Sequence, residues 1–247
     1  MSLETTEFGK TGIQVTRLGY GAMELRNLPE THAQNILNLV LDSGINFIDT
    51  SIDYGESENL IGKYISHRRN QYFLASKCGC PVGDVKEHVF TKDNIEKGID
   101  QSLKRMKTDY LDLVQLHSCD IDVLNKGEAI RALQDAKKAG KTRFIGYSGD
   151  NDAALWAVES DQFDTLQTSF SLLDQNARLK LFEPVRSREM GLIAKRPIAN
   201  GAWGSKISPS KMMRYNNTYT DEYFRRSQLM ESERDVINAP EDNILLA

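Results

Sequence analysis

Residues 73–77 read Phe73-Leu74-Ala75-Ser76-Lys77, a short apolar run that ends in a lysine. Two other runs end in a polar group: Phe47-Ile48-Asp49 in a carboxylate and Leu113-Val114-Gln115-Leu116-His117 in an imidazole. Short apolar runs of this kind are typical of strands buried in a parallel sheet. The carboxyl ends of such strands line the binding face of α/β proteins, so these three end residues indicate a reaction site.

Strand-like and helix-like segments alternate along most of the chain. Strands are predicted to begin near Leu18, Asn46, Tyr72, Leu111, Thr142, Thr165 and Gly191. Helices are predicted between them over residues 30–42, 56–66, 92–106, 126–139, 153–159 and 178–189. Thr91 and Asp150 stand where helix N-caps belong. Three glycines follow helices at positions that favour a positive φ: Gly44, Gly140 and Gly191.

This alternation predicts the class of fold. Successive right-handed crossovers favour a closed (β/α)₈ TIM barrel, of the α/β class, over an open doubly wound sheet. The dinucleotide fingerprint of the open fold is poor, because Gly19-Tyr20-Gly21-Ala22-Met23-Glu24 ends in Glu and no helix opens at once. Residues 7–17 alternate polar and apolar side chains around a glycine-containing turn and predict an N-terminal β-hairpin cap. With 247 residues, positions 1–247 fit a single barrel domain.

The bulk composition narrows the class of partner. Charged residues make up 27 % and hydrophobic residues 40 % of the chain, as in ordinary globular proteins. A net charge of −4 shows no basic footprint, so we expect no nucleic-acid partner. The N-terminus has no leader pattern and no apolar run approaches the ~18 residues of a membrane span, so we expect a cytoplasmic protein. No heptad pattern decides the oligomeric state.

The cysteines and histidines give no clear metal signature. Cys78 and Cys80 are too close in sequence for an easy disulfide, and reduced, partly buried thiols are expected. A metal site of Cys78, Cys80 and Cys119 stays open as an alternative, although it lacks a C-x-x-C partner pair. The four histidines, His32, His67, His88 and His117, show no ligand spacing. No metal is therefore expected, and a metal-dependent barrel enzyme is the most remote alternative.

Asp49, Tyr54, Lys77 and His117 together make a proton-handling set. Tyrosine, with a pKa near ~10, is a poor acid until a nearby ammonium lowers its pKa, and Lys77 is the candidate ammonium. The Asp49 carboxylate would keep a buried lysine charged, while His117 would hydrogen-bond a carbonyl or assist proton transfer. Each residue alone has a simpler explanation as a cap, packing or surface residue. Their joint placement indicates acid catalysis on C=O, the part that a protein supplies to nicotinamide chemistry.

Two longer blocks resemble a known family. The stretch from Phe8 to Met23 and the block from Gly44 to Glu58, which contains Phe47-Ile48-Asp49-Thr50-Ser51-Ile52-Asp53-Tyr54-Gly55, resemble bacterial aldo-keto reductases. With Ala75-Ser76-Lys77 and Gln115-Leu116-His117, the resemblance covers residues 5 to about 205. It implies a barrel that binds NADPH or NADH without a Rossmann fold and reduces aldehydes or ketones. It also implies the same roles: Tyr54 as general acid, Lys77 and Asp49 tuning it, and His117 orienting the carbonyl.

The resemblance extends to cofactor contacts. Ser148 and Gln167 match residues that hydrogen-bond the nicotinamide carboxamide, whereas Gly149 stands where the family usually has Asn. Lys195 replaces an aromatic residue that stacks on the nicotinamide in many members, and Arg196 could contact the pyrophosphate. Further candidate cofactor contacts are Gly21, Ala22, Met23, Asp49, Pro197, Ile198 and Gly201. Trp203 is a candidate for the wall of the substrate pocket, with core packing as an equal alternative.

The last part of the chain departs from the repeat. A polar region over 208–217 and a charged helix from 220 to about 234 precede what looks like a new helix at 240–247. In the family an eighth strand, a final helix and a loop for the adenosine 2′-phosphate follow, so the choice between NADPH and NADH is left open. The chain is expected to be part of a longer protein. A natural open barrel and a barrel completed by another chain remain alternatives.

Two classes of function follow. The first is NAD(P)H-dependent reduction of a small-molecule aldehyde or ketone, with NADPH as the expected cofactor and NADH as the alternative. The second is a non-catalytic or cofactor-deficient regulatory or binding protein on the same scaffold, since the family also includes channel-associated subunits. The physiological substrate is not predicted, because loops set it and the family is promiscuous.

Overall fold

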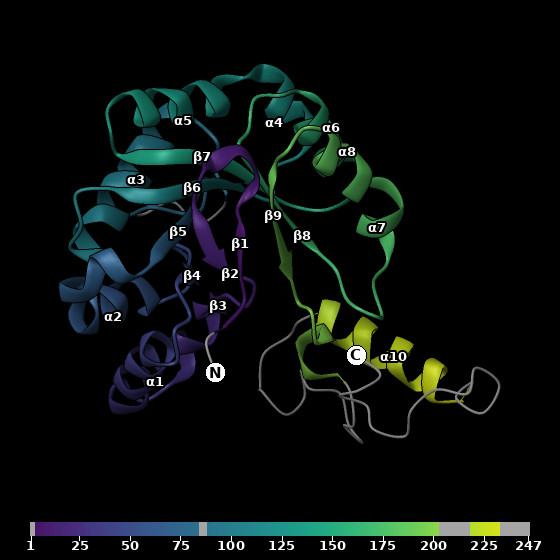
Figure 1. The fold of residues 1–247 in the computed structure, drawn as a ribbon. Helices are drawn as coiled ribbons and strands as arrows, with labels where there is room; N and C mark the ends of the chain where they lie inside the picture. The colour runs from purple at the N-terminus through teal and green to yellow at the C-terminus, as the bar shows by residue number, and fades with distance from the viewer. Residues whose placement is uncertain (1–2, 84–87, 203–217, 233–247) are drawn as a thin grey trace.

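The computed structural model describes residues 3–83, 88–202 and 218–232. Its main sheet has seven parallel strands in chain order, β3 (Tyr20–Gly21), β4 (Phe47–Asp49), β5 (Phe73–Cys78), β6 (Leu111–His117), β7 (Thr142–Ser148), β8 (Thr165–Ser169) and β9 (Gly191–Lys195). The sheet curls into a half-barrel with helices along its outer side (Figure 1). Within the described ranges no eighth strand joins the edge strands β3 and β9. The predicted α/β architecture is confirmed, and every strand begins within two residues of its predicted start.

The helices lie between the strands as predicted, except that α4 was not predicted and one predicted helix is divided in two. The observed helices are α1 (Glu30–Asp42), α2 (Ser57–Tyr64), α3 (Lys92–Met106), α4 (Ile121–Lys126), α5 (Glu128–Lys138), α6 (Asn151–Glu159), α7 (Asn176–Lys180), α8 (Phe182–Ser187) and α10 (Thr218–Ser232). The helix predicted over 126–139 is confirmed as α5, which begins two residues later because Gly127, with a φ of 69°, ends the unpredicted helix α4. The helix predicted over 178–189 breaks at Leu181; Pro184, which has no N–H, lies in the first turn of α8.

Three of the five predicted helix ends are confirmed, whereas Gly191 and the side chain of Asp150 do not cap a helix. Thr91 caps α3 by accepting a hydrogen bond from the Asn94 amide at 3.4 Å. Gly44 and Gly140 have φ values of 86° and 76°. The prediction for Gly191 was wrong, because Glu189 takes the positive φ of 53°. Gly191 instead begins β9 beneath an aromatic ring, where an added Cβ would lie 2.8 Å from Phe8 Cε2.

The predicted hairpin consists of β1 (Thr5–Glu7) and β2 (Gln14–Thr16), joined through the 3₁₀ turn η1 (Gly9–Thr11). It lies across the amino-terminal end of the half-barrel, in front of the sheet in Figure 1. Phe8 packs edge-on against Phe47 and Phe73 with centroid distances of 5.6 Å each. The Lys10 amide donates a 2.6 Å hydrogen bond to the Glu189 carbonyl. The hairpin therefore closes this end of the barrel with aromatic packing and a backbone link to the loop before β9.

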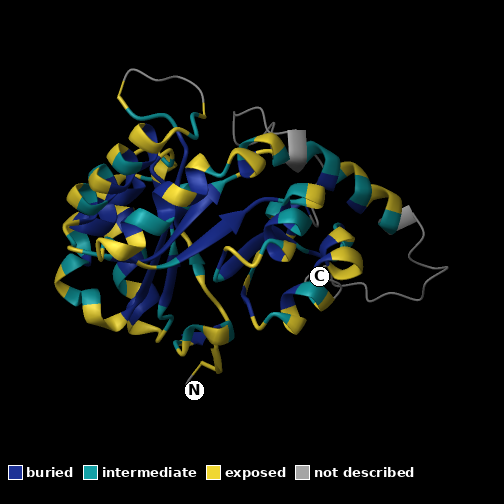
Figure 2. Cartoon of the chain, turned by 90° about the horizontal axis from the view of Figure 1, so that it is seen from above, coloured by how far each residue is buried: buried dark blue, intermediate teal, exposed yellow. Residues whose placement is uncertain are grey.

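Burial follows the arrangement expected for a parallel sheet covered by helices. All residues of β5 are buried, and β6 is buried up to His117, which is partly exposed. Figure 2 shows the strands as the most continuously buried elements, whereas the helices carry buried and exposed faces side by side. The largest hydrophobic cluster lies between the strands and these helices. A parallel strand buried on both faces has few polar positions, so the polar ones in β4 to β9 require an explanation.

Asp112 forms a clasp that ties three strands together near their amino ends. Its side chain is 3 % exposed, and one oxygen accepts from the Leu74 amide at 2.8 Å and from Arg69 at 2.6 Å. The other oxygen accepts from Arg143 at 2.8 Å. The carboxylate lies on β6, while Leu74 lies on β5 and Arg143 on β7. Because three donors satisfy it, this buried charge is stable only while all three strands keep their positions.

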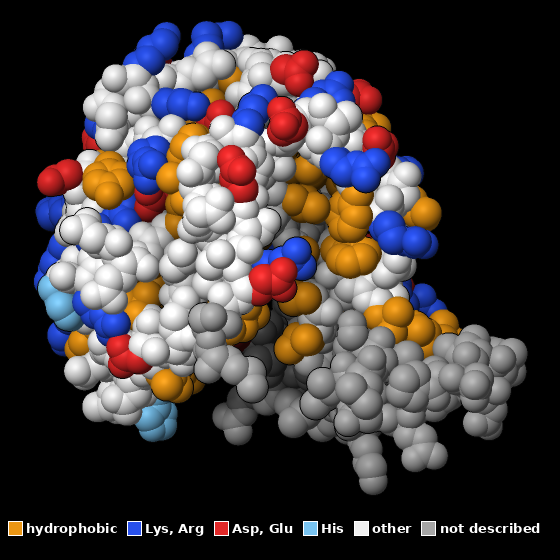
Figure 3. Space-filling view, in the orientation of Figure 1, with side chains coloured by type: hydrophobic (Ala, Val, Ile, Leu, Met, Phe, Trp, Pro, Cys, Tyr) orange, Lys and Arg blue, Asp and Glu red, His pale blue; other side chains and the backbone are white. Residues whose placement is uncertain are grey.

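The β9 side of the molecule exposes hydrophobic side chains. Leu179 is 72 % and Ile198 is 64 % exposed, and Leu192 on β9 is 36 % exposed. Figure 3 shows hydrophobic side chains gathered on the right of this face, over β9 and the nearby helices α7 and α8. Single exposed hydrophobic residues are ordinary, but this group borders an edge strand of the sheet.

Helix α10 forms a small cluster of its own beyond the carboxyl ends of β8 and β9. Tyr223 packs with Leu173, Ala199 and Ala202, and its hydroxyl donates to Asp174 at 3.0 Å. The helix predicted from residue 220 to about 234 is confirmed as α10. The predictions for Trp203 and for residues 208–217 and 240–247 lie outside the described residues. No helix in the described part of the chain is both long and apolar enough to cross a bilayer.

Candidate active site

The structure brings Asp49, Tyr54, Lys77 and His117 together at the carboxyl end of the half-barrel. Asp49 ends β4, Lys77 lies one residue before the end of β5, and His117 ends β6. Tyr54 follows Asp49 in the turn before α2. The Lys77 ammonium lies 4.8 Å from the centroid of the Tyr54 ring, and the Tyr54 and His117 rings are 6.2 Å apart. Three neighbouring strands therefore place one polar residue each beside the same phenol.

Lys77 is held by two oxygens of the β4 end. Its ammonium donates to Asp49 Oδ2 at 2.6 Å and to the Thr50 carbonyl at 2.8 Å. The Lys77 side chain is 1 % exposed and that of Asp49 is 13 % exposed. Burial alone lowers the pKa of Lys77, but Asp49 and then Tyr54 outweigh burial, and the pKa is raised above its ordinary value. Lys77 thus stays positively charged in spite of its burial.

The pKa of Tyr54 reflects two opposing effects. Burial, the largest cause, raises the pKa of Tyr54 above its ordinary value of 10, and the positive charge of Lys77 partly opposes this rise. Asp49 and Asp53 raise it further. The predicted lowering by Lys77 is therefore present, but burial exceeds it. The phenol is protonated at neutral pH, which is the form that an acid catalyst needs.

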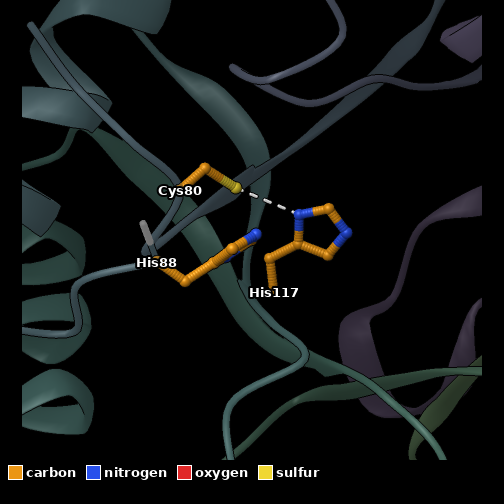
Figure 4. Close-up of side chains that lie close together, drawn as sticks. All are labelled: Cys80, His88 and His117. Atoms are coloured by element: carbon orange, nitrogen blue, oxygen red, sulfur yellow. Dashed lines mark hydrogen bonds between the residues drawn. The ribbon is translucent and has the colours of Figure 1, made fainter. Parts of the chain in front are cut away.

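His117 has a neutral ring and a thiol neighbour. Burial, followed by the charge of Lys77, lowers the pKa of His117 to about 3. Its Nδ1 lies 3.0 Å from the Cys80 sulfur, 3.5 Å from Ser51 Oγ and 3.7 Å from Asp53 Oδ1. Figure 4 shows the Cys80 sulfur directed at Nδ1 and the second ring nitrogen turned away from it. Burial raises the pKa of the Cys80 thiol to about 12, so the thiol carries a hydrogen that Nδ1 can accept.

Gln115 is a further polar residue beneath the site. It lies on β6, two residues before His117, and its Nε2 donates to Asp49 Oδ1 at 3.1 Å. Its Oε1 is buried and has no protein partner within the described part of the chain. Each oxygen of Asp49 thus accepts from a different side chain, Lys77 on one and Gln115 on the other. A polar residue inside a buried strand is the signal that could have identified it from sequence.

The two residues expected to bind a carboxamide contact each other. Ser148 ends β7 and donates from its hydroxyl to Gln167 Oε1 at 2.8 Å. In the sheet, His117 pairs with Ser148 and Ser148 with Gln167, so the three side chains stand on consecutive strands. At Gly149 an added Cβ would lie 2.6 Å from the Tyr147 ring. A residue larger than glycine, such as the Asn that is usual in the family, therefore does not fit at position 149 unless Tyr147 shifts.

Lys195 and Arg196 gather around one acid at the end of β9. Lys195 Nζ lies 3.3 Å and an Arg196 nitrogen 3.8 Å from Asp150 Oδ2. Arg196 also donates to Ser169 Oγ at 2.7 Å. Burial, more than Arg196, lowers the pKa of Lys195 to about 8, although Asp150 opposes the shift. A negatively charged ligand bound beside Lys195 and Arg196 would favour the protonated form of Lys195 and raise its pKa.

Asp150 does not act as the helix cap that its position predicts. Although it precedes α6, its side chain makes no capping hydrogen bond. It accepts instead from the Ser169 amide at 2.7 Å and from Thr168 Oγ1 at 2.9 Å, in addition to its contact with Lys195. A buried lysine and a strand-end amide are stronger partners for a carboxylate than the exposed first turn of a helix.

The remaining cofactor candidates lie at the two edges of the sheet. Gly21 ends β3 and pairs with Asp49, and Ala22 and Met23 follow in a 3₁₀ turn. On the other side Pro197 and Ile198 are exposed in the loop after β9, and Gly201 has a φ of 74°. The candidate residues therefore run along the whole carboxyl end of the half-barrel, from β3 to β9.

A cavity of about 360 Å³ opens next to this rim. Asp150, Thr168 and Ser169 line one side of it, and Tyr223 and Arg226 of α10 line the other. None of Asp49, Tyr54, Lys77 and His117 lines this cavity. The cavity therefore adjoins the candidate cofactor residues and does not include the proton-handling set.

The sequence suggested either a site of three cysteines or no metal ligands at all, and the observed arrangement of the cysteines and histidines differs from both. Cys78, Cys80 and Cys119 are free, as expected, and all three are buried rather than partly buried. Within the described ranges these three do not form a group of metal ligands. Cys80, His88 and His117 do, with ligand atoms all within 4.8 Å of one another. Sequence spacing missed this group because His88 lies eight positions after Cys80, and helix α3 and most of β6 lie between His88 and His117.

Comparisons with known proteins identify the family. Residues 17–238 match the model of the aldo/keto reductase family, and the chain belongs to this family. It is 32 % identical over 216 residues to L-galactose dehydrogenase of Arabidopsis thaliana, covering 81 % of this chain and 66 % of that protein. It is 31 % identical to 6-dehydroglucose reductase of Novosphingobium aromaticivorans, covering 78 % and 66 %. The chain spans about two thirds of the length of these relatives.

A solved structure agrees with this assignment. The holo form of an aldo-keto reductase from Bacillus halodurans has a TM-score of 0.78 to this chain and 27 % sequence identity, covering 97 % of this chain and 78 % of that one. The fold and the family are therefore those that the resemblance implied.

Proposed function

We propose that this chain catalyses the NAD(P)H-dependent reduction of an aldehyde or ketone to an alcohol. The observation that carries the proposal is the position of the Lys77 ammonium, 2.6 Å from Asp49 and 4.8 Å from the Tyr54 ring, beside a neutral His117. A buried ammonium that stays charged next to a protonated phenol suits proton donation to a carbonyl oxygen. Membership of the aldo/keto reductase family supports the same reaction class.

The proposed proton transfer assigns one role to each residue. Tyr54 donates its hydroxyl proton to the substrate oxygen, and the charge of Lys77 stabilises the phenolate that forms. Asp49 keeps Lys77 charged and fixed, and Gln115 holds the second oxygen of Asp49. With Nδ1 accepting from Cys80, the His117 ring carries its hydrogen on Nε2 and donates it to the carbonyl oxygen, which sets the angle of approach.

The donor set fits a nicotinamide cofactor, which would supply the hydride when bound. The Ser148 hydroxyl and the Gln167 amide stand next to each other beside His117 and suit a carboxamide. Lys195 and Arg196 offer charges for the phosphates. Gly21, Ala22, Met23, Asp49, Pro197, Ile198 and Gly201 would complete the contacts. NADPH is the cofactor that we expect, and NADH is the alternative.

The relatives suggest the substrate class to test first. The names L-galactose dehydrogenase and 6-dehydroglucose reductase refer to sugars and their oxidised forms. We propose that the substrate is a small polyhydroxylated carbonyl compound, and that the protein works in the cytoplasm without nucleic acid or membrane as partner.

The test measures cofactor binding and turnover separately. NADPH and NADH are titrated by the change in their own fluorescence, and oxidation of the bound cofactor is then followed with a panel of sugar aldehydes and simple ketones. Tyr54→Phe should lower turnover by about 10²- to 10⁴-fold, the usual contribution of a general acid, with cofactor affinity nearly unchanged. Tyr64→Phe at the end of α2, a partly buried tyrosine away from the site, is the matched control. Failure to bind either cofactor would favour the non-catalytic alternative, and turnover retained in Tyr54→Phe would remove Tyr54 from its role.

A further inference from the structure

Three ligand-type side chains converge at the edge of the site, and one of them, His88, has no role in the proposed proton transfer. Cys80 follows β5, His88 lies in the loop before α3, and His117 ends β6. The sulfur of Cys80 and one ring nitrogen from each histidine all lie within 4.8 Å of one another. Figure 4 shows the Cys80 sulfur and the His88 ring directed toward Nδ1 of His117. We propose that Cys80, His88 and His117 form a binding site for a zinc-class divalent ion.

The residue types select the class of ion. One thiolate and two imidazoles are ligands that suit Zn²⁺ and related transition metals, whereas Mg²⁺ and Ca²⁺ prefer oxygen. Zinc bond lengths and a tetrahedral angle place a sulfur and a nitrogen ligand ~3.6 Å apart. The observed distance of 3.0 Å between Cys80 and His117 must therefore widen by about half an ångström. The thiol proton leaves to solvent as the sulfur binds the ion, so one proton is released for each ion bound.

The backbone already holds two of the ligands next to each other. The Val89 amide donates to the Gly79 carbonyl at 2.9 Å, which closes the base of the loop between them. The Asn94 side-chain amide donates to the Cys80 carbonyl at 3.0 Å and to the Val89 carbonyl at 2.8 Å. One side chain of α3 therefore clamps the residue that carries the sulfur and the neighbour of His88. These hydrogen bonds hold the ligand residues in place before the metal binds, so binding costs less conformational entropy.

Gly79 and Phe90 complete this loop base. Gly79 has a φ of 86°, and an added Cβ would lie 2.1 Å from the Phe90 ring. The His88 and Phe90 rings stack with centroids 6.1 Å apart, and the His88 and His117 rings are 5.6 Å apart. His88 is exposed, so its ring can adjust toward the ion at low cost. The exposed ligand, His88, is thus the one that can adjust, while the sulfur is buried.

Asp53 lies beside His117 but outside the group of three ligand atoms, so it would have to move toward the ion to become a fourth ligand. Its Oδ1 lies 3.7 Å from His117 Nδ1, close to the ~3.4 Å that tetrahedral zinc requires between nitrogen and oxygen. Its carboxylate and the Cys80 thiolate would together balance the two positive charges of the ion. The nearby Lys77 is already balanced by Asp49. The site therefore gathers the charge needed to accept a dication next to a buried ammonium.

Binding would disturb the reaction proposed above by moving the His117 ring, because Nε2 keeps its hydrogen while the distance between Nδ1 and the Cys80 sulfur widens by about half an ångström. The ion takes Nδ1 and the sulfur, replaces their hydrogen bond, and adds positive charge beside the phenol. We therefore expect zinc to inhibit carbonyl reduction reversibly. This consequence rests on the proposed function, whereas the site itself does not.

Cobalt(II) tests the site directly, because it substitutes for zinc and gives a thiolate-to-metal charge-transfer absorption band. Tag-free protein without cofactor is titrated with Co²⁺ alone and then with Zn²⁺. One Co²⁺ should bind per chain with a charge-transfer band, and Zn²⁺ should displace it. Cys80→Ser should lose the band, and His88→Ala should bind at least ~10-fold more weakly. The matched controls are Cys119→Ala, a buried thiol, and His67→Ala, an exposed histidine, and both should behave as the parent.

The outcomes separate the site from the reaction. Absence of the band in the parent, or a band that survives in Cys80→Ser, overturns the site. If the parent reduces carbonyls, His88→Ala should keep its turnover and need at least ~10-fold more Zn²⁺ for half inhibition. Equal sensitivity of both would overturn the inhibitory role. If the parent shows no carbonyl reduction, the cobalt titration still decides the site, because its readout does not involve turnover.

Discussion

The Cys80 thiol determines which ring nitrogen of His117 carries a hydrogen. With Nδ1 accepting from the sulfur at 3.0 Å, Nε2 is the donor that faces away from Cys80 in Figure 4. Asp53, 3.7 Å away, would favour the opposite tautomer if the sulfur were removed. Cys80 is thus a positioning residue for the proposed reaction, and it acts only through His117.

Cys80→Ala should lower turnover about tenfold, because losing one hydrogen bond of ~1 kcal/mol also admits the wrong tautomer. Cys80→Ser keeps a hydroxyl donor and should restore most of the turnover. The measurement is kcat and KM for one aldehyde, together with the ¹⁵N chemical shifts of His117, which distinguish the two tautomers. Equal turnover and equal shifts in Cys80→Ala and the parent would contradict this role.

Lys195 gives the molecule a pH dependence of stability. Its pKa is about 8 in the folded chain, and in the unfolded chain it returns to its ordinary value of 10.5. Between pH 8 and pH 10.5 the unfolded state binds more protons than the folded state, so the free energy of unfolding rises with pH over this window. Below pH 8 Lys195 is charged in both states, and the folded state carries the full energetic cost of burying that charge. Urea unfolding at pH 7 and pH 9.5 should therefore show the parent gaining stability relative to Lys195→Met.

Lys195→Arg is the control for this effect. Its guanidinium stays charged throughout the window, so it should lack the relative gain. A parent whose stability falls in parallel with both variants between pH 7 and pH 9.5 would show that Lys195 does not titrate in this range.

At the residue scale, the sequence predicted the proton-handling set but not its neighbours. Lys77 and His117 could be identified because each ends an apolar run whose direction and depth follow from the sheet. The contact of His88 with Cys80 depends on the hydrogen bonds that Asn94 of α3 donates to the Cys80 and Val89 carbonyls. The periodicity of apolar residues does not predict side-chain hydrogen bonds of this kind. The role of Asp150 was also missed, because its partners come from β8 and β9.

The hairpin and β9 approach each other at the backbone level. Gly9 has a φ of 55°, and an added Cβ would lie 2.3 Å from the Gly191 amide nitrogen. Gly9→Ala should therefore destabilise the fold by at least ~2 kcal/mol, combining a backbone clash with left-handed strain. Gly12→Ala is the matched control, since its φ is 69° but open space surrounds it, and it should cost only ~1 kcal/mol.

Chemical denaturation of the two variants measures this difference. If Gly9→Ala and Gly12→Ala lose the same stability, strain alone accounts for both, and the close approach of the hairpin to β9 makes no contribution. A larger loss in Gly9→Ala would assign the excess to the backbone contact.

At the element scale, strands were predicted more accurately than helices. A buried strand must be apolar along its length, so its start is visible in the sequence within two residues. A helix that breaks in the middle keeps its apolar face on both sides of the break. Leu181 therefore caused no change in the pattern, although it separates α7 from α8.

The whole molecule contains packing regions of unequal size. The main cluster lies between the sheet and the outer helices, whereas α10 is held by Tyr223, Leu173, Ala199 and Ala202. Amide hydrogens of α10 should therefore exchange with solvent faster than those of α3, because opening α10 exposes far less apolar surface. Tyr223→Phe removes the hydrogen bond to Asp174 and should accelerate exchange in α10 alone.

Hydrogen exchange followed by mass spectrometry separates these peptides. Equal protection of α10 and α3 would show that the two helices open together in one cooperative unit. The exchange of α3 in Tyr223→Phe is the internal control, and it should match that of the parent.

At this scale, the seven-stranded α/β architecture and the hairpin were predicted, and the family match agrees with them. The expectation of one domain over residues 1–247 stays a prediction. Cofactor identity and substrate were not predictable, because loop side chains such as those after β9 determine both.

The Asp112 clasp matters for anyone who wishes to redesign this protein. It joins β5, β6 and β7 near the end opposite the candidate active site. Those strands deliver Lys77, His117 and Ser148 to the rim. A randomised library directed at the rim loops can thus leave the frame untouched, whereas one that includes Asp112 would be dominated by misfolded clones. New specificity should be sought at one end of the barrel while the other end is kept constant.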